Sequence, residues 1–184
     1  MDIGCLVNIE TDRGTDVGLT KLTRADQRTV PEIADELSKA ASQLRAGKDR
    51  NHNKQKPALS WLPTFLLEPV VGLMGWLGSM GIAIPALGVK AFPFGTICVT
   101  SVGVLGLDSA FVPFSPFARV PLLITIGAIG QKAVVNDITE EVVAERQLPL
   151  TITVDHRFLD GAQGARMLRD IKKILQDPYK YLLD

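Results

Sequence analysis

The chain has 184 residues, a length typical of one domain with a real hydrophobic core. Twenty Lys and Arg residues balance twenty Asp and Glu residues, so no overall basic field points to nucleic-acid binding. Cys5 and Cys98 are too few for a disulfide framework and lie in apolar runs, which predicts buried free thiols in a reducing compartment. No signal peptide is visible, so we expect a cytoplasmic protein, with the mitochondrial matrix or a peripheral membrane location as alternatives.

The first segments predict a hairpin followed by a helix. Residues 3–9 and 17–22 have the composition of strands, and a turn at residues 11–14 joins them. Thr29-Val30-Pro31-Glu32 forms a capping box with proline in the first turn, which predicts a helix that ends at Gly47. Residues 48–56 form a polar, basic connector, and we interpret its His52 as part of a solvated loop.

Charged residues become rare over residues 57–139. Residues 70–89 carry no charge over about twenty residues, which is the length that spans a bilayer. We reject a transmembrane helix because five glycines and Pro85 interrupt the segment, and each interior glycine costs about 1 kcal/mol relative to alanine. We expect instead a short apolar helix at residues 61–77, followed by a glycine-rich loop packed on protein.

The second half of the chain alternates strands with irregular segments. Residues 96–100 predict a buried strand, and three prolines make residues 111–121 a stiff, irregular crossing. Residues 122–129 and 131–135 predict two more strands, the second followed by a turn at residues 136–137.

The stretch Asp155-His156-Arg157-Phe158-Leu159-Asp160-Gly161 lies at a strand-to-helix junction. Residues 148–154 alternate like a half-buried strand, and residues 161–176 have the spacing of an amphipathic helix that Pro178 ends. The imidazole of His156 exchanges protons readily near neutral pH, so it is a candidate general base or part of a polar network. Asp160 is a candidate helix N-cap with Gln163, and Arg157 a candidate partner for a carboxylate.

This stretch resembles the active-site signature of the dihydrolipoamide acyltransferase cores of 2-oxo acid dehydrogenase complexes. Chloramphenicol acetyltransferase and peptide-synthetase condensation domains share the wider His-x-x-x-Asp-Gly pattern, usually with a second histidine where Asp155 stands here. The resemblance covers residues 3–47 and 95 to the C-terminus. It implies an α/β fold of the CoA-dependent acyltransferase type, a mixed sheet flanked by helices. We therefore expect residues 1–184 to form one catalytic domain that lacks its N-terminal part, with an apolar insertion at residues 57–94 and no lipoyl domain.

The resemblance also implies roles for particular residues. His156 is the expected general base, and Thr100 stands where the family usually has a serine that donates a hydrogen bond to the oxyanion. Asp160 is expected to fix the loop, with support from Asp155 and Arg157. Tentative contacts to the substrate or to CoA are assigned to Ser101, Gly103, Arg157 and Arg119. On the residues alone, Thr100 is equally a strand residue, and Arg119 meets a CoA phosphate, a neighbouring subunit or an internal ion-pair partner.

The implied reaction moves an acyl group between a dihydrolipoyl-type thiol and coenzyme A. Coenzyme A is a co-substrate, no metal-spaced histidine cluster is present, and any lipoyl group belongs to a partner. The family implies a homotrimer. Two alternatives stay open: a catalytically degenerate scaffold subunit, or a membrane-surface acyltransferase with another acceptor. We expect the insertion at residues 57–94 to cover the acyl pocket, to form a subunit contact or to rest on a membrane surface.

Overall fold

The computed structural model describes residues 1–184 except 12–13, 47–62, 86–88, 116–117, 137 and 183–184. The chain opens with the expected hairpin, in which β1 (Ile3–Thr11) pairs antiparallel with β2 (Gly14–Leu22). The connector with His52 and the predicted turns at Asp12 and Asp137 lie wholly or partly outside the described residues.

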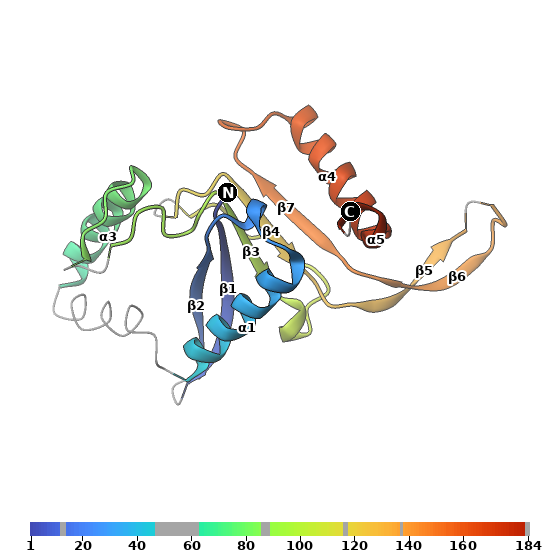
Figure 1. Cartoon of the computed structure of the whole chain (residues 1–184), viewed down its shortest axis with the longest axis horizontal. Coiled ribbons are helices and arrows are strands. Elements are labelled where there is room, and N and C mark those ends of the chain that lie inside the picture. The colour runs from blue at the N-terminus through green and yellow to red at the C-terminus, as the bar shows by residue number, and fades with distance from the viewer. Residues whose placement is uncertain (12–13, 47–62, 86–88, 116–117, 137, 183–184) are drawn as a thin grey trace.

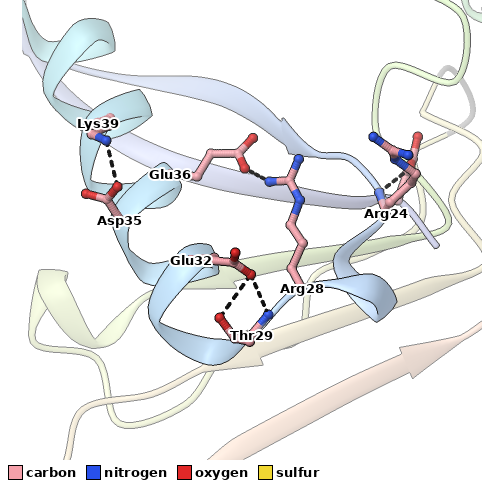
Figure 2. Close-up of polar contacts among 8 residues, drawn as sticks. Arg24, Arg28, Thr29, Glu32, Asp35, Glu36 and Lys39 are labelled. Atoms are coloured by element: carbon pink, nitrogen blue, oxygen red, sulfur yellow. Dashed lines mark hydrogen bonds and ion pairs between the residues drawn. The ribbon is translucent and has the colours of Figure 1, made fainter.

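Helix α1 (Val30–Arg45) begins at the capping box that the sequence predicts. The backbone N–H and the hydroxyl of Thr29 each donate to the Glu32 carboxylate at 2.9 Å, as Figure 2 shows. Arg28 forms an ion pair with Glu36 on the same face of the helix (Figure 2). A short 3-10 helix at Ala25–Gln27 links this start to the hairpin.

Five strands form one mixed sheet in the order β2-β1-β3-β4-β7. Its remaining strands are β3 (Ile97–Ser101), β4 (Leu122–Ile126) and β7 (Leu150–Val154). Strands β1, β3 and β4 run parallel, whereas β2 and β7 run antiparallel to their neighbours. The mixed sheet that we expected is therefore present, with α1 against β1 and β2.

Outside the sheet, β5 (Gly130–Val135) and β6 (Val142–Gln147) form a separate antiparallel ribbon. The ribbon extends away from the sheet at the end opposite α3, as Figure 1 shows. The chain then passes through β7 into α4 (Gly161–Gln176) and the short α5 (Pro178–Leu182). Strand β6 was not predicted, because Glu145, Arg146 and Gln147 interrupt the apolar alternation that marks a strand.

Helix α3 (Thr64–Ser79) is the apolar helix expected near residues 61–77, although Trp61 and Leu62 lie outside the described part. It ends at Ser79, and two residues later Gly81 has a φ of +81°, a conformation that glycine adopts at low cost. Within the part of the chain that the structure describes, no helix has both the length and the apolar character needed to cross a bilayer.

The core is small and lies mainly where α1 meets the first hairpin. Val7, Ile9 and Leu44 form its buried cluster. Gly18 permits this contact, because a Cβ there would lie 2.6 Å from the Ile9 side chain. Both cysteines are buried on the neighbouring strands β1 and β3, and burial, together with the nearby Cys5, raises the pKa of Cys98 to about 11. Buried free thiols were expected and are found.

Candidate functional site

The His156 loop, residues 155–160, is fixed by its backbone to the start of β4. The Asp155 N–H donates to the carbonyl of Pro121 at 2.9 Å, which continues the β4–β7 pairing by one step. The Phe158 and Leu159 N–H groups donate back to the Asp155 carbonyl at 2.9 and 3.2 Å. His156 lies at the bend that these bonds close and is exposed. A firmly held backbone therefore presents a free imidazole.

Asp155 holds Arg157 in a tight charged pair. The Arg157 Nε lies 3.0 Å from both carboxylate oxygens, and one Nη donates at 2.6 Å. These hydrogen bonds lower the pKa of Asp155 and raise that of Arg157. The carboxylate partner expected for Arg157 is thus the residue two positions before it. The guanidinium also lies 5.9 Å from the centre of the Phe158 ring.

Asp160 caps α4 as predicted. Its carboxylate accepts from the Gln163 N–H at 2.7 Å, and its own N–H donates to the Gln163 side chain at 3.1 Å. This reciprocal cap fixes the residue where the loop becomes helix. The second end of the His156 loop is therefore held as well as the first.

Thr100 lies at the opposite end of the sheet from His156. Thr100 pairs with Thr125 on β4, which in turn pairs with Thr151 on β7. Extended chain runs from Thr151 to Asp155, the residue before His156, which is four steps and about 13 Å at about 3.3 Å per residue. One copy of the chain therefore does not bring the imidazole and the Thr100 hydroxyl together.

The other predicted residues divide between the two ends of the sheet. Ser101 ends β3 beside Thr100, and Gly103 begins the 3-10 turn that follows, close against the backbone of Gly127. Arg119 and Arg157 instead line a cavity beside the His156 loop. Arg119 forms no ion pair with any residue in the described ranges. It stands in the left-handed region at φ +49°, directly before the segment that leads into β4.

This cavity, called here the loop cavity, has a volume of about 880 Å³. It lies where the chain enters β1, β3 and β4 and leaves β7. Four phenylalanines line it, namely Phe92, Phe94, Phe114 and Phe158. Sequence reasoning missed all four as site residues. Only Phe158 carried a signal, because it stands inside the seven-residue signature, whereas the other three come from irregular segments whose meeting no periodicity predicts.

Metal binding has no visible basis in the described ranges, where no group of three or more His, Cys, Asp and Glu side chains could hold an ion.

Comparison with known proteins places these features in a family. The sequence profile described as "2-oxoacid dehydrogenases acyltransferase (catalytic domain)" matches residues 86–183. The chain belongs to this acyltransferase family.

Two relatives carry more specific names. The dihydrolipoyllysine-residue acetyltransferase component of the pyruvate dehydrogenase complex of Bacillus subtilis is 30% identical over 95% of this chain. Its mitochondrial counterpart in Saccharomyces cerevisiae is 28% identical over 66% of this chain. The chain spans only 30% and 27% of the length of these two relatives.

Solved structures show the same fold. A probable dihydrolipoamide acetyltransferase from Listeria monocytogenes matches with a TM-score of 0.58 at 19% identity, over 95% of this chain and 56% of its own. The Azotobacter vinelandii dihydrolipoamide acetyltransferase matches with a TM-score of 0.58 at 18% identity, over 97% of this chain and 56% of its own. The Azotobacter vinelandii structure belongs to an investigation of a serine, a histidine and an asparagine in that enzyme's catalytic mechanism, and the asparagine stands four positions after the histidine.

Proposed function

We propose that the protein transfers an acyl group between a dihydrolipoyl-type thiol and coenzyme A. The observation that carries this proposal is the loop at residues 155–160, which holds His156 exposed while both of its ends are fixed by hydrogen bonds. Family membership supports the reaction class, and the spacing of His156 and Asp160 equals that of the histidine and asparagine named for the Azotobacter vinelandii enzyme.

The reaction is a thioester exchange. His156 accepts the proton of the incoming thiol, and the thiolate attacks the carbonyl carbon of the donor thioester. A tetrahedral intermediate forms with its charge on the former carbonyl oxygen. The carbon–sulfur bond of the donor then breaks, and the departing thiolate takes the proton back from His156. The net change is exchange of one thiol for another, with no oxidant or metal needed.

Thr100 donates the hydrogen bond to the oxyanion from a second copy of the chain. The wide separation of Thr100 and His156 within one copy supports this arrangement, because the two side chains of one subunit cannot act on the same thioester. Loss of one such donor typically costs about 2.7–4 kcal/mol of barrier. We propose a homotrimer in which each site lies between two subunits, with Ser101 and Gly103 on the Thr100 side.

The remaining charged residues bind and position. Asp160 and the Asp155–Arg157 pair hold the loop in its conformation. Arg119, which forms no ion pair with any residue in the described ranges, is assigned to binding the substrate or coenzyme A beside the His156 loop.

The direct test is His156→Ala in the full chain. We expect acyl transfer from acetyl-CoA to free dihydrolipoamide to fall at least a hundredfold, because general-base catalysis contributes about 10²–10⁴-fold. Circular dichroism and the thermal unfolding midpoint should match those of the wild type, since His156 is exposed and makes no packing contact on which the fold depends. Retained turnover would refute the role of His156, and no turnover by the wild type would favour a scaffold subunit instead.

A further inference from the structure

We infer that the loop cavity is the acyl-group subsite, and that it accepts apolar acyl groups larger than acetyl. The inference rests on the proposed function, because it assigns a part of the same site. The relatives compared above are named as acetyltransferases, so this assignment sets the chain apart from them.

Position and size give the first argument. Asp155, Arg157 and Phe158 line the cavity, so it adjoins the His156 loop, although His156 itself is not among the lining residues. Its volume of about 880 Å³ falls within the range of about 300–1,000 Å³ of pockets that hold drug-sized ligands. A two-carbon acyl group would leave most of this space unfilled.

The walls give the second argument: four phenylalanines line the cavity and both acids on the lining are paired, which leaves Arg119 as the lining charge without an ion-pair partner in the described ranges. The Asp2 carboxylate lies 3.4 Å from the Lys21 ammonium and accepts from the Arg24 N–H at 3.1 Å. The Asp155 carboxylate is occupied by Arg157. Both acids on the lining thus have cationic or N–H partners, and neither is left to bind a cationic ligand. Phe92, Phe114 and Phe158 are more than a third exposed and present ring surface to a ligand.

Backbone contacts fix the conformation of Phe92, which forms one wall of the loop cavity. Its φ of +45° is unusual for a bulky residue and costs free energy unless surrounding contacts impose it. Those contacts are present: the Phe92 N–H donates to the Gly78 carbonyl at 2.9 Å, and its carbonyl accepts from the Gly95 N–H at 3.1 Å and from the Lys21 ammonium at 3.2 Å. Gly81 leaves room for the ring, since a Cβ there would lie 3.0 Å from it.

The apolar insertion therefore supplies part of this wall. Helix α3 ends at Ser79, which lines the cavity, and the Phe92 N–H donates to the Gly78 carbonyl in the last turn of the helix. Helix α3 lies outside the residues that match the family profile. The insertion thus carries substrate selection rather than the bond-making chemistry.

The test is an acyl-chain series with free dihydrolipoamide as acceptor. We expect kcat/KM to rise about fourfold per added methylene from acetyl-CoA through butyryl-CoA to hexanoyl-CoA. Phe92→Ala should remove most of this rise, because only the longer chains reach the ring. Phe114→Ala, in a segment outside the insertion, should act in the same direction and serves if Phe92→Ala does not fold.

Phe65→Ala is the matched control, since Phe65 is 77% exposed on α3 and does not line the cavity. It should leave the series unchanged. Equal kcat/KM values for all chain lengths would overturn the inference. So would a preference for succinyl-CoA that disappears in Arg119→Gln, because the subsite would then recognise a carboxylate.

Binding separates this inference from the proposed function. Titration calorimetry on His156→Ala should show hexanoyl-CoA binding at least tenfold tighter than acetyl-CoA, whether or not the wild type turns over. If the wild type is inactive but this preference is present, the proposed function fails and the subsite stands. If the preference is absent, the subsite fails regardless of turnover.

Discussion

Asp160 has a structural task that is separable from its charge. Its carboxylate caps α4, and an amide oxygen can accept the same hydrogen bond from the Gln163 N–H. We expect Asp160→Asn to change the free energy of unfolding by less than about 0.5 kcal/mol, whereas Asp160→Ala should cost about 1 kcal/mol. Urea unfolding measures both.

Turnover of the same variants tests whether Asp160 positions the loop or transfers protons. We expect Asp160→Asn to keep most of the acyl-transfer rate, because the cap and hence the loop are preserved. Asp160→Ala should lose at least tenfold, since misplacing a catalytic group by about 1 Å can cost about a hundredfold. Equal loss in both variants would mean that the charge itself is required.

Gly127 is a second residue whose replacement has a defined cost. A Cβ at Gly127 would overlap the Asp108 carbonyl oxygen, which belongs to the backbone and cannot swing away. We expect Gly127→Ala to lower the free energy of unfolding by about 1–3 kcal/mol. Gly164→Ala is the control, because no heavy atom lies within 4 Å of a Cβ there and alanine favours a helix interior by about 1 kcal/mol. A neutral Gly127→Ala would show that the two backbones separate easily.

At the scale of elements, the sequence predicted those boundaries that a local polar interaction sets. The boxes at Thr29 and Asp160 mark the starts of α1 and α4, and both are found. Local chemistry suffices there because an orphan N–H must be satisfied within a few residues.

Features that depend on neighbours were not predictable. The spacing over residues 161–176 predicted an amphipathic helix, yet two of its leucines, Leu168 and Leu175, are 44% and 52% exposed on α4. Met167 and Ile174, the residues directly before these two leucines, are less exposed, as is Ile171. The periodicity of apolar residues predicts that a helix has an apolar face, but it does not predict which element or subunit covers that face. For the same reason the loop cavity was not predictable, since its walls come from segments far apart in the chain.

At the scale of the whole molecule, the chain exposes apolar surface on three separate parts. Exposed large apolar side chains include Leu73 and Trp76 on α3, Val135 and Val142 on the ribbon, and Leu168 and Leu175 on α4. Large apolar patches on a protein surface usually mark a contact with another molecule. Together with the separation of His156 from Thr100, this exposure supports the proposed assembly.

Mixing two inactive variants tests that assembly. Unfolded and refolded together, His156→Ala and Thr100→Ala chains should recover about a quarter of the wild-type rate, because about one interface in four pairs an intact His156 with an intact Thr100. Each variant refolded alone should stay inactive, and Thr100→Ser should be active by itself. If mixing restores nothing while the mixed particle has the wild-type mass, the two residues do not share a site.

The buried thiols on β1 and β3 provide a natural probe for opening of the centre of the sheet. With the pKa of Cys98 raised to about 11 by burial, almost none of it is thiolate at pH 7, while an unfolded cysteine of pKa about 8.5 is a few per cent thiolate. Iodoacetamide should therefore label Cys98 only when the strands part. The alkylation rate, followed by mass spectrometry, would time the opening of the middle of the molecule without any introduced probe.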